Sequence, residues 1–171
     1  MTVKSLFALA FVLFVWNTLP SHAQEIDDEN VPSEIGMAME LGPFAQSYSI
    51  DGSVNPFYLR GDFDGDGKAD YAIRIKSKRG GELGFAIWLS SRKKIVVLGA
   101  GIPFKVSGQA ATNLKVLNTW QVYPRRPVEQ GVASGPPPRL IGEAILAGKR
   151  ESASGLIYWN GKSFVWYQQG D

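Results

Sequence analysis

The chain contains no cysteine and a single histidine, His22, among its 171 residues. Without cysteine it forms no disulfide bonds, so its stability must come from a hydrophobic core, with help from a metal ion where one binds. His22 lies in an N-terminal segment that we expect to be removed from the mature protein, as the next paragraph explains. The mature protein could then form no Ser-His-Asp triad, Cys-His pair or histidine-ligated zinc site. Enzymatic chemistry would then depend on carboxylates, lysine, tyrosine or a hard metal ion.

Long apolar runs are also scarce, and the longest lies at the N-terminus. Lys4 precedes an apolar run over residues 6–16, and Ser21-His22-Ala23 then offers a small-x-small cleavage site. The run is too short to cross a bilayer, which takes roughly 20 apolar residues, although an uncleaved anchor is the alternative. We expect residues 1–23 to be a signal peptide cleaved near Ala23. The mature form would be periplasmic or secreted, would have no membrane span and would lack His22.

Neither sign of charge is in large excess, because 18 Lys and Arg residues face 16 Asp and Glu residues, for a formal net charge of +2. This balance gives no indication of a nucleic-acid partner. The cationic residues gather at Lys76, Lys78, Arg79, Arg92, Lys93, Lys94, Arg125 and Arg126. Such clusters are either a solvated rim or a surface that attracts anionic partners.

The hydrophobic pattern divides the rest of the chain into a polar leader, residues 24–32, and a single β-rich domain, residues 33–171. Residues 33–41 have a cap-like serine and good helix formers, which favours a short helix. Alternation over residues 70–76 predicts a half-buried strand with Tyr71, Ile73 and Ile75 on one face. Further strands are predicted over residues 83–89 and 95–101, joined by tight polar turns, as in an antiparallel meander.

The middle of the chain is less regular. Residues 101–117 are ambiguous and have room for a short helix, whereas residues 119–123 and 139–148 are strand candidates. Between these two candidates, residues 124–138 are rich in proline and glycine and predict an exposed loop, either functional or disordered.

The C-terminal residues predict a β-hairpin. Asn160-Gly161 separates two strand-like runs, and this pair suits a two-residue turn in which both residues have positive φ. Trp159, Ile157, Phe164 and Trp166 would then share an apolar face, with Leu156, Tyr158, Val165 and Tyr167 opposite. The expected fold is mainly β, all-β or α+β, with antiparallel meander sheets in one compact domain and a short N-terminal helix.

The stretch GDFDGDGKAD, residues 61–70, carries the clearest chemical signal. Counted from Asp62, carboxylates stand at positions one, three, five and nine: Asp62, Asp64, Asp66 and Asp70. Calcium binds six to eight oxygens, and such a loop can direct them to one centre, with Gly67 at the sharp turn and the Lys68 carbonyl as a further ligand. An EF-hand loop would end with Glu at position twelve, where this chain has Ile73. A plain Asp-Gly turn is the alternative.

The segment GDFDGDGKADYAI resembles the D-x-D-x-D-G-x-x-D calcium loop of FG-GAP and VCBS-type repeats, known from integrin β-propeller blades. The resemblance covers about 15 residues. It implies side-chain ligation of calcium by Asp62, Asp64, Asp66 and Asp70, backbone ligation by Lys68, and a mainly structural role for the ion. The motif occurs once, whereas a propeller needs several blades, so a full propeller is not expected.

These observations favour an exported, non-enzymatic, calcium-binding domain that binds or inhibits an unknown protein or glycan of the cell envelope. Trp88, out of phase with its strand, and the loop 124–138 are candidate contacts. A carbohydrate-binding module with Tyr158 and Tyr167 as stacking platforms is an alternative. A metal- or carboxylate-dependent hydrolase is less favoured, because the available glutamates have no recognisable catalytic spacing: Glu82, Glu129, Glu143 and Glu151.

Overall fold

The computed structural model describes residues 31–40 and 42–170. The expected signal peptide and most of the expected leader lie outside this range. Val31, assigned to the leader, is buried in the core, and Pro32 accepts hydrogen bonds from the N–H groups of Ile35 and Gly36 in the first helical turn. No helix in the described part of the chain is long and apolar enough to cross a membrane.

The described residues form two short helices and eleven strands, which confirms the mainly β prediction. The elements are α1 (Ser33–Glu40), α2 (Pro43–Ser47), β1 (Tyr48–Ile50), β2 (Tyr58–Gly61), β3 (Asp70–Ser77), β4 (Leu83–Leu89), β5 (Lys94–Gly99), β6 (Phe104–Val106), β7 (Gln109–Ala111), β8 (Thr119–Tyr123), β9 (Ala144–Gly148), β10 (Ser154–Trp159) and β11 (Phe164–Gly170). The strands predicted over residues 70–76, 83–89 and 119–123 are present.

All strand pairs are antiparallel. The first sheet has the order β1-β3-β4-β5. The strand β2 pairs with the same edge of β3 as β1 does. On that edge, β1 pairs with the C-terminal half of β3 and β2 pairs with the N-terminal half. The second sheet is the meander β11-β10-β9-β8, and β6 with β7 forms a separate hairpin. The Asp-rich loop, residues 62–69, therefore joins two strands that pair with each other.

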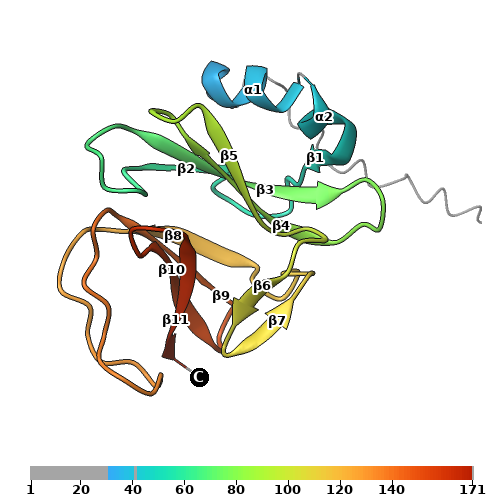
Figure 1. Cartoon of the computed structure of the whole chain (residues 1–171). Coiled ribbons are helices and arrows are strands. Elements are labelled where there is room, and N and C mark those ends of the chain that lie inside the picture. Colours follow the sequence, from blue (N-terminus) through green and yellow to red (C-terminus); the bar gives the residue numbers. More distant parts are fainter. Residues whose placement is uncertain (1–30, 41, 171) are drawn as a thin grey trace, which may run out of the picture.

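The two sheets face each other across the main core, and the helices cover the opposite side of the first sheet (Figure 1). Successive residues of β3 and β4 alternate between these two cores: Ala72, Phe85 and Ile87 face the second sheet, whereas Ile73 and Ala86 face the helices. The half-buried interpretation of residues 70–76 was therefore incomplete, because both faces of β3 are covered. Arg74, which alternation places on the face opposite Ile73 and Ile75, is only 1% exposed.

The outer face of the second sheet is covered by the proline- and glycine-rich loop. Val128 and Leu140 from this region pack with Leu156 and Tyr167 of the sheet in a third cluster. Gln130 Nε2 donates to the carbonyls of Gly131, Ala133 and Gly135, which holds the loop in a compact turn. The loop 124–138 is thus a structural cover of the sheet (Figure 1).

The structure resolves one region that the sequence left ambiguous and corrects one predicted turn. Residues 101–117 contain the hairpin β6-β7 and no helix, because Ser107 and Gly108 both take positive φ values, 49° and 81°, and reverse the chain. The C-terminal hairpin has a four-residue connection, residues 160–163, in which Asn160 Oδ1 accepts the N–H groups of Lys162 and Ser163. The shift in register is two residues, so the predicted faces of the hairpin are preserved.

Candidate metal centre

The Asp-rich loop closes on its own first residue. Asp62 follows the end of β2, and its carboxylate oxygens accept the N–H groups of Gly65 at 2.8 Å and Gly67 at 3.0 Å. Gly67 has a φ of 83°, a left-handed conformation in which glycine is favoured. This geometry matches the role that the sequence predicts for a glycine at position six.

Asp70, the first residue of β3, ties the loop to its neighbours. Its carboxylate accepts the N–H of Phe63 at 3.1 Å and, on the other oxygen, the N–H of Ser90 at 2.9 Å. Ser90 Oγ also donates to the carbonyl of Ala69 at 2.5 Å. Asp70 is only 1% exposed, and burial, with the nearby charge of Asp64, raises the pKa of Asp70 to about 6.

Asp64 is the most isolated of the aspartates. Its side chain is 0% exposed, and neither carboxylate oxygen has a hydrogen-bond partner. The Nε of Arg92 approaches Oδ2 to 3.0 Å without hydrogen-bond alignment, and the Arg92 side chain is 49% exposed. The same guanidinium lies 5.0 Å from the ring centroid of Trp159. Arg92 thus offsets part of the Asp64 charge from the solvent side, but the carboxylate oxygens lack the donors that a buried anion requires.

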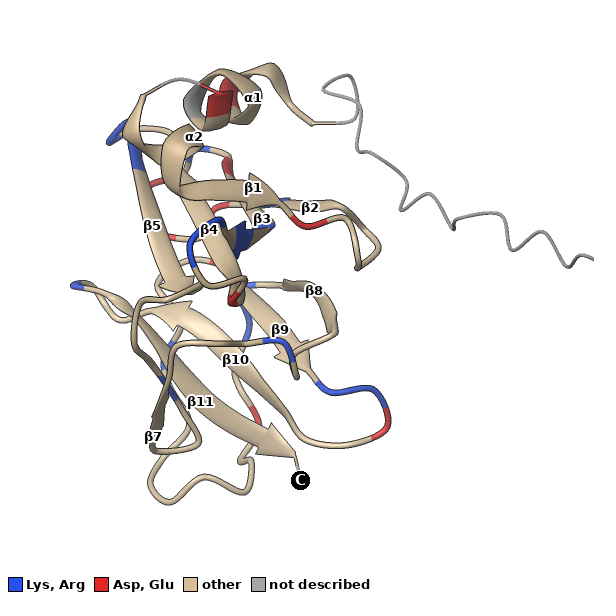
Figure 2. Ribbon diagram, turned by 90° about the vertical axis from the view of Figure 1, so that its right-hand side faces the viewer, with Lys and Arg blue, Asp and Glu red and all other residues tan. Residues whose placement is uncertain are grey.

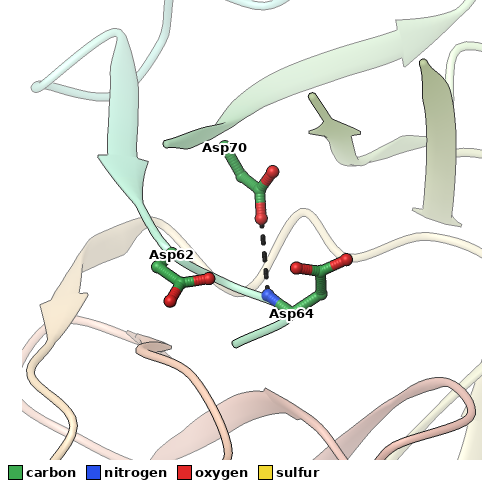
Figure 3. A group of neighbouring side chains, drawn as sticks. All are labelled: Asp62, Asp64 and Asp70. Atoms are coloured by element: carbon green, nitrogen blue, oxygen red, sulfur yellow. Dashed lines mark hydrogen bonds between the residues drawn. The ribbon is translucent and has the colours of Figure 1, made fainter. Parts of the chain in front are cut away.

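Ligand atoms of Asp62, Asp64 and Asp70 all lie within 4.8 Å of one another (Figure 3). Among the described residues, Arg92 is the only cationic side chain within 4.0 Å of any of the three carboxylates. Three carboxylates so close together repel one another unless a cation lies among them or one of them binds a proton. The arrangement can therefore coordinate a hard metal ion.

The fourth predicted carboxylate, that of Asp66, is not part of this group, and ligation by the Lys68 carbonyl stays a prediction. Asp66 is exposed and accepts the N–H of Lys68 at 2.9 Å. Hydrogen bonds from Ser91 and then from Lys68 lower the pKa of Asp66. Lys68 is also exposed. The described geometry thus brings together three of the four predicted carboxylates.

A residue that the sequence did not connect with the loop lies directly beside it. The carboxylate of Glu143 accepts the N–H of Asp62 at 2.9 Å, and the N–H of Glu143 donates to the carbonyl of Asp62 at 2.7 Å. The preceding Gly142 passes so close that a Cβ there would collide with the Asp62 carbonyl and the Gly65 nitrogen. The sequence placed Gly142 and Glu143 inside a strand candidate, residues 139–148, whereas β9 begins only at Ala144 and both residues precede it.

Searches of protein-family models, curated proteins and solved structures found no match to this chain. The resemblance to FG-GAP and VCBS-type loops therefore depends on the sequence motif alone.

The predicted binding residues lie in different surroundings. Tyr167 is buried in the third cluster, where its hydroxyl accepts the N–H of Gly131, and Tyr158 packs against the same cluster. The burial of Tyr167 leaves little of its ring for stacking on a ligand, whereas Tyr158 is half-buried. Trp88 is half-buried on the helix side of the first sheet, directly across from Tyr71, and both line a cavity of about 590 Å³.

Proposed function

We propose that the Asp-rich loop binds calcium and that the ion stabilises an exported binding domain. The observation that carries this proposal is the Asp64 carboxylate, which is fully buried, lacks hydrogen-bond donors and lies beside the carboxylates of Asp62 and Asp70. A divalent cation would supply positive charge to all three carboxylates, beyond the partial compensation of Asp64 by Arg92.

The chemistry of the donors favours calcium over transition metals. The side-chain atoms that could coordinate a metal here are all carboxylate oxygens. Such hard oxygen ligands suit calcium or magnesium, whereas zinc and copper prefer histidine and cysteine. Calcium also tolerates the irregular geometry of a loop better than magnesium, which demands an octahedron. The expected extracytoplasmic location adds support, because even weak calcium sites fill where calcium is plentiful.

A structural role fits the position of the site. The loop connects β2 to β3 in the first sheet, and Glu143, just before β9 of the second sheet, is hydrogen-bonded to Asp62. An ion held by Asp62, Asp64 and Asp70 would stabilise the corner where the two sheets meet. We therefore propose a non-enzymatic domain of the binding or inhibitor type, with the metal outside its ligand surface.

Calcium titration calorimetry tests this proposal on the chain and on the variant Asp64→Asn. We expect calcium binding by the chain, much weaker magnesium binding, and a loss of calcium affinity of about tenfold or more in the variant, because a neutral amide replaces a buried charge. A Glu129→Gln variant, which changes an exposed carboxylate outside the site, is the matched control. Equal calcium binding by the Asp64→Asn variant and the unmodified chain would refute the assignment.

The cavity beside Trp88 favours carbohydrate binding as a second candidate function. It combines the rings of Tyr71 and Trp88 with the polar side chains of Glu34, Ser90 and Lys93. Aromatic rings can pack against the apolar faces of sugars while polar groups bind the hydroxyls. Ser90 also donates its N–H to Asp70, so this cavity adjoins the proposed calcium site.

Glycan-array binding tests the second candidate. Trp88→Leu should abolish any glycan signal, whereas Trp166→Leu, which removes another half-buried tryptophan away from this cavity, should retain it. Circular dichroism establishes whether each variant folds. Equal glycan binding by both variants, or its absence from the unmodified chain, would count against this function.

A further inference from the structure

A second cavity, lined by arginine, proline and aliphatic residues, lies at the proline- and glycine-rich loop, on the outer side of the second sheet. Its volume is about 470 Å³, and its rim carries three arginines, Arg125, Arg126 and Arg139. Pro127, Pro137 and Pro138 also line it, so part of its wall has no backbone N–H to offer. Any hydrogen bonds that these walls donate to a ligand would come largely from the guanidinium groups.

Among the described residues, no carboxylate lies within 4.0 Å of the arginines that line this cavity. No acidic residue lines it, and the ion pairs found in the described residues, Arg74–Asp51 and Arg92–Asp64, lie elsewhere. Figure 2 shows Lys and Arg dispersed over both halves of the protein and not collected on one broad basic face. The concentration of three guanidinium groups around one hollow is therefore a local feature.

Contacts within the fold fix the position of this cavity. The guanidinium of Arg126 lies 4.7 Å from the ring centroid of Tyr123, and the Tyr123 hydroxyl donates to the carbonyl of Pro127 at 3.4 Å. Val128 and Leu140, both buried, form an apolar floor that belongs to the third core cluster. Of the three arginines, all of them exposed, Arg126 is held by its contact with Tyr123, and a donor held in place loses less conformational entropy on binding.

We propose that this cavity binds the phosphate group of a ligand whose apolar part rests on the floor of Val128 and Leu140. A guanidinium presents its donors in a rigid fork that matches phosphate oxygens, and three of them suit a tetrahedral, multiply charged group. A carboxylate, with one charge and two oxygens, would satisfy only one of the three. The phosphate belongs either to a small phosphorylated molecule or to an anionic lipid headgroup. This site is separate from the proposed calcium centre.

Calorimetric titration with inorganic phosphate and with glycerol 3-phosphate tests the site, with acetate as the competing carboxylate. Both phosphates should bind the chain more tightly than acetate does. Replacing Arg125, Arg126 and Arg139 together by glutamine should weaken phosphate binding by about tenfold or more, because each contributes charge-assisted hydrogen bonds. Arg150→Gln, which removes an exposed arginine outside the cavity, should leave it unchanged.

A vesicle experiment distinguishes the two sources of phosphate. Co-sedimentation with phosphatidylglycerol vesicles, compared with phosphatidylcholine vesicles, detects recognition of an anionic headgroup. Binding that needs the three arginines, either to soluble phosphates or to phosphatidylglycerol vesicles, supports the proposal. Thermal melting establishes that the triple variant is folded. Binding by the folded triple variant equal to that of the unmodified chain, or no binding of any phosphate probe, overturns it.

Discussion

Asp62 and Glu143 form a reciprocal pair, although 81 positions separate them in the sequence: the Glu143 carboxylate accepts the Asp62 N–H at 2.9 Å, and the Asp62 carbonyl accepts the Glu143 N–H at 2.7 Å. The first residue of the Asp-rich loop is thereby fixed to the segment that leads into β9. Any ion at the loop would be coupled to the contact between the two sheets through this pair.

Replacing Glu143 by alanine should destabilise both the fold and the calcium site. The variant leaves the partly buried N–H of Asp62 without its acceptor, which costs about 1 kcal/mol or more of the free energy of unfolding. Urea unfolding with and without calcium measures both effects. Glu129→Ala should change neither quantity. Equal stability of Glu143→Ala and the unmodified chain would mean that the pair does not brace the loop.

The two neighbouring aspartates Asp64 and Asp66 should differ in their importance for calcium. Asp64 is buried within the group of three carboxylates, whereas Asp66 is exposed and lies outside it. Asp66→Asn should therefore lower calcium affinity less than Asp64→Asn does, as measured by calorimetry. The opposite order would show that the loop rearranges around the ion so that Asp66 becomes the stronger ligand.

Arg92 should compete with calcium for Asp64. Its Nε lies 3.0 Å from Asp64 Oδ2, so its removal leaves the carboxylate without a cation when no metal is bound. Arg92→Gln should lower the melting midpoint in the presence of a chelator and increase the upward shift produced by calcium. Lys94→Gln, an exposed change two residues away, is the matched control. A smaller calcium-induced shift of the melting midpoint in Arg92→Gln than in the unmodified chain would show that Arg92 stabilises the calcium site and does not compete with the ion.

The raised pKa of Asp70, about 6, predicts how stability without metal depends on pH. An unfolded aspartate has a pKa near 3.9, so between about pH 4 and pH 6 the folded chain keeps a proton that the unfolded chain has released. The contribution of this proton to the free energy of unfolding is largest below pH 4 and is lost as the pH rises through 6. Calcium must displace the same proton, so calcium affinity should rise over this window.

Unfolding of the chain and of Asp70→Asn in chelator, measured from pH 4 to pH 7, tests this linkage. The stability of the chain relative to the variant should fall as the pH rises, because only the aspartate ionises. A difference that stays constant over this range would mean that Asp70 does not titrate there.

The buried ion pair between Arg74 and Asp51 should be a major support of the first sheet. Arg74 Nε lies 3.3 Å from Asp51 Oδ2, and the guanidinium also donates to the carbonyl of Leu117 and lies over the ring of Phe85. Asp51→Asn should lower the free energy of unfolding by about 3 kcal/mol, because a buried cation loses its partner. In a chain that already carries Arg74→Met, Asp51→Asn should lower the free energy of unfolding by much less. A similar loss in both backgrounds would place the effect outside the pair.

Much of the fold followed from hydrophobic alternation. Residues 70–76, 83–89 and 119–123 show a period of two, and the faces of the C-terminal hairpin were correct even though its loop is two residues longer than predicted. The hairpin β6-β7 was missed because strands of three residues are too short to show a period. Alternation also did not reveal that both faces of β3 are covered.

The candidate metal centre was only partly predictable. The spacing within residues 62–70 identifies a set of carboxylates, but it does not show that Asp66 lies outside the group and accepts the N–H of Lys68 instead. Glu143 enters the site through the packing of the second sheet against the first, a tertiary relationship that no local pattern encodes. The arginine cavity arises in the same way, because Arg139 joins Arg125 and Arg126 only when the loop folds back.

The melting midpoint of the chain in calcium, compared with that in chelator, tests the central claim most directly. A metal that binds only the folded state stabilises it by about 3 kcal/mol at a hundredfold excess over the dissociation constant, so calcium should raise the midpoint by several degrees. Asp64→Asn, with its calcium affinity lowered about tenfold or more, should reduce the increase by about half or more. An unchanged midpoint at millimolar calcium would contradict a structural calcium site in this loop.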